Sequence, residues 1–168
     1  MNAETYPSFY KKYIQEIPEM EADKLLDESL KETFKSLAMV NEEQASIPYA
    51  ENKWTIKDIL QHLMDTERIF CFRALAFARG EKKPLIGFDH EAYAKQAKAN
   101  SRSLKSLLEE FKQVRLTTKM LFSSFQTAMF YQSGWANDQE LTVAQLQMLI
   151  IGHHLHHLKV IERKYLYK

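Results

Sequence analysis

The chain of 168 residues contains a single cysteine, Cys71. One thiol forms neither an intrachain disulfide framework nor a cysteine-based zinc knuckle, so both kinds of scaffold are excluded. Glycine and proline number only four each, well below their usual combined share of about 12%. So few turn-forming residues argue against the many short strands of a sandwich or barrel, and a hydrophobic fraction of 45% excludes a disordered chain.

Charge of one sign is also lacking, because 23 basic and 22 acidic side chains leave a formal net charge of +1. This balance gives no basic footprint for nucleic acid. No apolar run approaches the roughly 20 residues that span a bilayer, and residues 1–9 show no apolar signal-peptide core. We therefore expect a cytoplasmic protein with neither a nucleic-acid nor a membrane partner.

Long stretches of the chain instead carry apolar side chains at spacings of three to five residues. This period is typical of amphipathic helices that bury one face. The predicted long helices cover Met20–Val40, Thr55–Gly80, Ser101–Phe125 and Thr142–Tyr165. Because such helices bury their apolar faces against one another, the sequence predicts an all-α fold, a four-helix bundle, as one domain over residues 1–168.

Capping boxes mark the starts of two of these helices. Thr55 is followed three residues later by Asp58, and Thr142 by Gln145. In such a pair each side chain bonds the backbone N–H of the other residue, which fixes the first helical turn.

The segments between the helices are predicted to be mostly loops. Residues 81–90 contain a proline and a glycine and read as a loop, whereas Glu91–Asn100 fits a short helix. Residues 126–141 are expected to be irregular, with a turn at Asn137-Asp138. Because this last segment leads directly into the final helix, we expect it to shape access to a site there.

The last predicted helix carries four of the six histidines, between His153 and His157. Its apolar stripe consists of Leu146, Leu149, Ile150, Val160 and Ile161. Continued at helical spacing, the stripe passes through His153 and His157, where Leu or Ile is expected. Side chains four residues apart share one helix face about 6 Å apart, so these two imidazoles can converge on one metal ion. The alternative is a pair of hydrogen-bonded core histidines, because buried imidazoles need partners.

The remaining histidines have less distinctive positions. His62 lies near the boundary of the apolar face of the second helix, either as a third metal ligand or as a locally hydrogen-bonded side chain. His154 and His156 lie nearer the edges of the last helix's stripe, where a solvated histidine cluster is one explanation for them. His90 lies in the loop with proline and glycine and is expected to face solvent.

Several segments together resemble those of the DinB-like superfamily, small metal-binding four-helix proteins, from about Trp54 to Tyr165. The matching segments are Lys53–Arg68 (KWTIKDILQHLMDTER), Phe77–Gly80 (FARG), Gly87–Asp89 (GFD), Glu140–Val143 (ELTV) and Gly152–His157 (GHHLHH).

The resemblance implies a metal triad of His62, His153 and His157 that holds a divalent ion, zinc or nickel. Many relatives have glutamate where this chain has His154, a difference beside the triad that leaves its three residues intact. Three imidazoles leave coordination positions open, as in a catalytic site. Asp65, Thr66 and Glu67 are the nearest polar candidates to orient the ring of His62, and Glu67 belongs to the matching segment.

The resemblance also implies an activity. The favoured hypothesis is a thiol S-transferase of the bacillithiol type. In such an enzyme the metal ion lowers the pKa of a low-molecular-weight thiol, which attacks an unidentified small-molecule electrophile. A metal-dependent hydrolase is the first alternative. The second is a non-catalytic metal-binding or stress-response protein, whose site would be closed by a fourth ligand such as His156 or His90. A homodimer is implied as well.

Two further chemistries are disfavoured. A di-iron carboxylate bundle needs Glu-x-x-His motifs, and neither His153 nor His157 has a glutamate three residues before it. Cys71 lies between two phenylalanines on a predicted apolar helix, so it is expected to be a core side chain rather than a nucleophile. The sequence assigns no catalytic residue and no organic cofactor.

Overall fold

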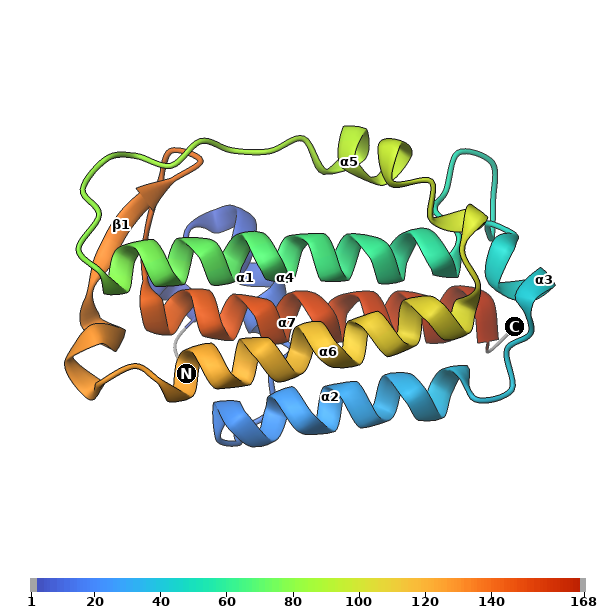
Figure 1. Ribbon diagram of the computed structural model, residues 1–168, viewed down its shortest axis with the longest axis horizontal. Coiled ribbons are helices and arrows are strands. Elements are labelled where there is room, and N and C mark those ends of the chain that lie inside the picture. Colours follow the sequence, from blue (N-terminus) through green and yellow to red (C-terminus); the bar gives the residue numbers. More distant parts are fainter. Residues whose placement is uncertain (1–2, 167–168) are drawn as a thin grey trace.

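Four long helices run side by side along the molecule in the computed structural model, which describes residues 3–166 (Figure 1). They are α2 (Ala22–Leu37), α4 (Ile56–Ala78), α6 (Leu104–Ser123) and α7 (Val143–Ile161). The helix α7 packs against both α4 and α2, and α6 packs against α4 and α2. The predicted all-α four-helix bundle is confirmed.

Shorter elements surround this bundle. The helix α1 (Ser8–Ile14) packs against α7, and α5 (His90–Ala97) packs against α4. The others are η1 (Ala3–Thr5), α3 (Glu42–Ser46), η2 (Ala99–Ser101), η3 (Thr127–Tyr131) and a π-helical turn, η4 (Glu162–Leu166). Within residues 3–166 no helix is both long and apolar enough to cross a membrane.

The segment before α7 is more regular than expected. It forms an antiparallel hairpin of β1 (Ser133–Ala136) and β2 (Gln139–Thr142). Asn137 and Asp138, at the tip, have positive φ angles of 52° and 58°, as a two-residue type I′ turn requires. The turn was predicted correctly, whereas the irregular conformation predicted for residues 126–141 is wrong.

Both predicted capping boxes are present. Thr55 Oγ1 accepts a hydrogen bond from the Asp58 backbone N–H at 3.0 Å, and the Asp58 carboxylate accepts one from the Thr55 backbone N–H at 3.0 Å. Thr142 and Gln145 form the same reciprocal pair at the start of α7. These caps fix where α4 and α7 begin, and therefore which of their side chains face inward.

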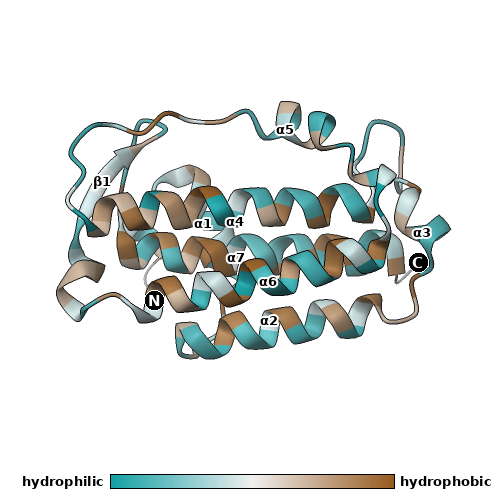
Figure 2. Cartoon of the chain, viewed as in Figure 1, coloured by the Kyte–Doolittle hydropathy of each residue, from teal (hydrophilic) through white to brown (hydrophobic). Residues whose placement is uncertain are grey.

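The apolar core is divided into two clusters by a layer of buried polar side chains. Hydrophobic and hydrophilic residues alternate along the long helices (Figure 2). One cluster includes Phe70 and Leu149, and the other includes Leu60 and Phe111. The layer between them consists of Ser29, Thr33, Thr66, Glu67, Arg115, Thr118, His153 and His154. Every long helix therefore contributes polar groups to the middle of the bundle.

Candidate metal centre

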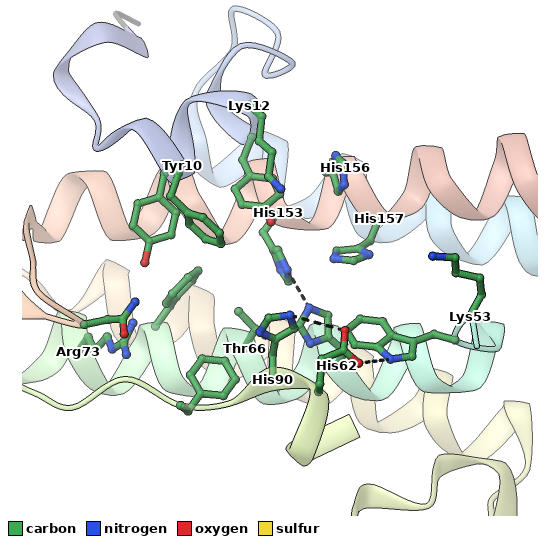
Figure 3. A pocket seen from close by; sticks show the side chains of 17 residues that line it. Tyr10, Lys12, Lys53, His62, Thr66, Arg73, His90, His153, His156 and His157 are labelled. Carbon is green, nitrogen blue, oxygen red and sulfur yellow. Dashed lines mark hydrogen bonds and ion pairs between the residues drawn. The ribbon is translucent and has the colours of Figure 1, made fainter. Parts of the chain in front are cut away.

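Three histidines from two helices converge beside this polar layer. His62 comes from α4, and His153 and His157 from α7, and one ring nitrogen of each lies within 4.8 Å of the other two. The Nε2 atoms of His62 and His153 are only 3.0 Å apart. Figure 3 shows the rings meeting in the space between the two helices. The structure thus brings together all three residues of the expected triad.

Burial keeps these imidazoles neutral. It lowers the pKa of His62 to about 4, with His90 as a smaller cause. Burial, followed by the proximity of His62, lowers the pKa of His157 to about 2. The pKa of His153 is also held well below 6.5, chiefly by burial. At neutral pH each ring therefore keeps a free nitrogen lone pair, the form in which histidine binds metals.

Aromatic rings hold the triad from two sides. Trp54 lies with its ring centroid 4.6 Å from that of His62 and is parallel to His157 within 22°. Its indole Nε1 donates a hydrogen bond to Glu91 at 3.1 Å. On the other side, the Tyr13 ring contacts His153 edge-on at 5.4 Å. These contacts restrict the rotation of the imidazoles and so favour a fixed arrangement.

The triad lines an open cavity of about 590 Å³. Aromatic side chains make up much of its wall, among them Phe9, Phe70 and Phe88. Its cationic lining residues are Lys12, Lys53 and Arg73, whereas the acidic one is Glu91. A cavity of this size and polarity accommodates a small molecule.

The other two histidines of the cavity stay outside the triad. His90, the first residue of α5, has a half-exposed side chain, as expected, but its ring is 5.9 Å from that of His62 and also lines the cavity. His156 packs edge-on against Tyr13 at 5.2 Å. Neither belongs to the group of nitrogens within 4.8 Å of one another, which in residues 3–166 comprises the triad.

His154 is deeply buried, and the prediction of a solvated side chain is wrong for it. Only 1% of its surface is exposed. Its Nε2 lies 2.7 Å from Thr33 Oγ1, and its Nδ1 lies 3.0 Å from Arg115 Nη2. It therefore points away from the cavity, into the polar layer.

Glu67 does not contact His62, so its expected role in orienting that ring is wrong. Its two carboxylate oxygens instead accept hydrogen bonds from Arg115 Nε and Nη2, at 3.0 and 2.9 Å. Both side chains are almost fully buried. Arg115 was not predicted as a buried residue, although its spacing from Phe111 and Thr118 places it on the buried face of α6.

Cys71 is not a nucleophile in this arrangement. Burial raises the pKa of its thiol to about 11, so the thiol is protonated at neutral pH. Its Sγ lies 3.3 Å from Thr118 Oγ1, between α4 and α6. The expected shaping of the cavity by residues 126–141 is limited to one lining residue, Asn137.

The protein is thus a helical bundle with a histidine triad at the wall of an open cavity. The family model of the DinB superfamily matches residues 25–161. The chain therefore belongs to the DinB superfamily, and the resemblance seen in the sequence is confirmed.

Two solved structures share the fold. The first is YfiT from Bacillus subtilis, described as a probable metal-dependent hydrolase with an unusual four-helix bundle topology. It matches with a TM-score of 0.73 and 16% sequence identity, and the match covers 97% of this chain and 91% of YfiT. The second is a mycothiol-dependent maleylpyruvate isomerase, with a TM-score of 0.70 and 11% identity over 87% of this chain and 61% of that one. No curated protein matches the chain.

Proposed function

We propose that the protein is a metal-dependent enzyme in which His62, His153 and His157 bind one divalent ion, zinc or nickel. The observation that carries this proposal is the convergence of three neutral imidazole nitrogens within 4.8 Å at the wall of a cavity. Imidazole suits both metals.

The donor set fits such an ion. Ligands about 2.0–2.1 Å from a tetrahedral zinc lie roughly 3.3 Å from one another, which is close to the 3.0 Å between the Nε2 atoms of His62 and His153. The buried Nδ1 of His157 has no hydrogen-bond partner in residues 3–166. A bound ion or the water that accompanies it would meet this unsatisfied requirement.

We further propose a reaction in which a low-molecular-weight thiol attacks a small electrophile. When bound, the metal ion supplies Lewis acidity that lowers the pKa of a ligated thiol or water molecule. Trp54 and Tyr13 contact the rings of the triad, and Lys12 and Arg73 supply positive charge that attracts an anionic substrate. Three protein ligands leave a coordination position for the reacting group. The similarity to a mycothiol-dependent isomerase supports thiol chemistry.

Hydrolysis of a small molecule is the second candidate, supported by the similarity to a probable metal-dependent hydrolase along nearly the whole chain. A non-catalytic metal-binding role is the third. It predicts a site closed by a fourth side chain, and His90 and His156 lie outside the group of three converging nitrogens.

Metal content is the first test. Untagged protein purified without chelator should contain about one zinc or nickel per chain by inductively coupled plasma mass spectrometry. The His62→Ala variant should lose this metal and the matched His156→Ala variant should keep it. No metal in the parent chain, even after incubation with zinc and nickel, would contradict the proposal.

Activity is the second test. The zinc and nickel forms should be assayed with a chloronitroarene and a panel of thiols, including bacillithiol, mycothiol and cysteine, in which the thiolate displaces chloride. A nitrophenyl ester without thiol tests hydrolysis. Turnover of the chloronitroarene that requires thiol and disappears in His153→Ala supports transfer. Turnover of the ester without thiol supports hydrolysis. Absence of both reactions supports a non-catalytic metal-binding role.

The homodimer stays a prediction. The exposed apolar side chains of Phe72 on α4 and of Leu116 and Met120 on α6 support it, because apolar surface favours association. Multi-angle light scattering should give twice the mass of one chain.

A further inference from the structure

Arg73 is a buried cation at the wall of the cavity that contains the triad. It lies on α4, eleven residues after His62. At about 100° and 1.5 Å per residue, this spacing returns to the same helix face about 16 Å further along the axis. Thr66 and Phe70 lie between them on this wall. Figure 3 shows Arg73 and the triad separated along α4, with Tyr10 above Arg73.

Within residues 3–166, no carboxylate forms an ion pair with this guanidinium. Only 3% of Arg73 is exposed. Its Nη2 donates a hydrogen bond to the Ile86 carbonyl oxygen at 3.2 Å, and the Tyr10 hydroxyl interacts with it as a neutral partner. A guanidinium has five N–H donors, so several remain for another acceptor.

Comparison with Arg115 shows that Arg73 lacks a counter-ion. Arg115 is equally buried, but Glu67 receives two of its hydrogen bonds and neutralises its charge. A buried charge without a counter-ion is costly to the fold. Arg73 bears this cost beside a cavity, where a ligand can supply the negative charge.

The rest of the cavity also favours a negatively charged ligand. Lys12 and Lys53 add positive charge, and the acidic lining residue, Glu91, already accepts a hydrogen bond from Trp54 Nε1. Along α4, Phe70 lies on the wall between the triad and Arg73, and Phe88 also lines the cavity. Along the α4 wall the cavity therefore presents the Arg73 cation, then an apolar surface, then the triad.

We propose that Arg73 binds a carboxylate group of the substrate, at the end of the cavity away from the triad. A planar guanidinium and a planar carboxylate match in a bidentate pair, and one negative charge balances one buried positive charge. The substrate is thus an elongated organic carboxylate whose apolar part contacts the aromatic wall and whose reacting group reaches the triad. The position of the reaction rests on the proposed function, whereas carboxylate binding by Arg73 does not require a metal.

The test uses metal-free protein, so that the probe cannot bind a metal ion. Phenylacetate and 4-phenylbutyrate are titrated by isothermal calorimetry, with phenylacetamide and 4-phenylbutyramide as neutral analogues. We expect the carboxylates to bind and the amides to bind at least tenfold more weakly. Arg73→Gln should weaken carboxylate binding about tenfold or more, because hydrogen bonds to charged groups are the stronger ones. Arg73→Lys should retain part of the affinity.

The matched control is Arg79→Gln, which removes an exposed arginine just after α4 that does not line the cavity. It should leave the affinity unchanged. Equal affinity of carboxylates and amides, equal affinity of the parent and Arg73→Gln, or no carboxylate binding at millimolar concentration would overturn the proposal.

Arg73→Gln also removes the hydrogen bond to the Ile86 carbonyl oxygen, so its effect is not limited to carboxylate binding. A second measurement therefore uses the parent chain alone. In the parent chain the side-chain Nε–H resonance of Arg73 should shift when 4-phenylbutyrate is added, and that of Arg79 should not. A shift confined to other residues would overturn the assignment. Failure to bind metal would contradict the proposed enzyme and leave these results unaffected.

Discussion

Arg115 on α6 donates a hydrogen bond from Nη2 to Nδ1 of His154 on α7, 3.0 Å away. A guanidinium cannot accept, so Nδ1 is the acceptor and the ring proton lies on Nε2. Nε2–H then donates to Thr33 Oγ1 at 2.7 Å, and Thr33 Oγ1 donates to the Ser29 carbonyl oxygen at 3.0 Å. This chain of hydrogen bonds joins α6, α7 and α2 directly behind the triad.

Removing His154 should therefore destabilise the fold without emptying the metal site. In His154→Ala, Arg115 and Thr33 each lose a buried partner, which should lower the free energy of unfolding by about 2–4 kcal/mol. Urea unfolding measures this loss, and elemental analysis should still find about one zinc per chain. The control His156→Ala, at a half-exposed position, should change stability by about 0.5 kcal/mol or less. Loss of zinc in His154→Ala as complete as in His153→Ala would contradict the ligand assignment.

The features predicted correctly depend on neighbours in the sequence. The capping residues Thr55 and Thr142 act within one helical turn, and His153 and His157 share a face because of helical geometry alone. For His62 the helical pattern left two alternatives, and the resemblance favoured the metal ligand, because the pairing of α4 with α7 brings it to His153 across 91 positions of sequence.

The features missed depend on tertiary packing. The burial of His154 was not predicted, because His154 lies about 100° from His153 around the helix, nearer the edge of the apolar stripe. However, α7 packs against α1, α2 and α4, so little of its surface is free. The partnership of Arg115 with Glu67 spans 48 residues and leaves no local pattern. The short hairpin strands were missed because four residues each are too few to show a clear alternation.

Zinc should stabilise the protein through the triad. A ligand that binds only the folded state raises the free energy of unfolding by about 2.7 kcal/mol at one hundred times its dissociation constant. Differential scanning fluorimetry of chelator-treated protein should therefore show a higher melting temperature when zinc is added. The effect should be absent in His157→Ala and present in His156→Ala. Equal stabilisation of both variants would show that zinc binds elsewhere.

Acid should destabilise the metal-free protein before carboxylates titrate. The pKa of His62 falls to about 4 and that of His157 to about 2 in the folded state, mainly through burial, against about 6.5 when unfolded. Below pH 6.5 the unfolded chain binds more protons, so the free energy of unfolding decreases as pH falls. Each such histidine contributes up to about 1.4 kcal/mol per pH unit.

Urea unfolding at pH 7.0, 6.0 and 5.5 should show this decrease, and His62→Gln should reduce its slope. Stability that rises as pH falls over this range would mean that the imidazoles gain protons in the folded protein. Bound zinc should suppress the decrease, because it holds the rings in the unprotonated form.

Gly152 allows α1 to approach α7, and alanine at this position should loosen that contact. A Cβ atom there would lie 2.5 Å from the Tyr13 carbonyl oxygen, a backbone atom that cannot move without α1. Glycine to alanine normally stabilises a helix by about 0.5–1 kcal/mol, but here the overlap should destabilise the protein by about 1–3 kcal/mol. Ala144→Gly on the same helix calibrates the helical preference.

Because Lys12 and Tyr13 of α1 line the cavity, Gly152→Ala should also weaken the binding of 4-phenylbutyrate to metal-free protein, whereas Ala144→Gly should not. Urea unfolding and calorimetry on the two variants measure both effects. A Gly152→Ala variant as stable as the parent would show that α1 can move away from α7 at little cost. In that case an unchanged affinity for the carboxylate would mean that α1 does not set the shape of the cavity.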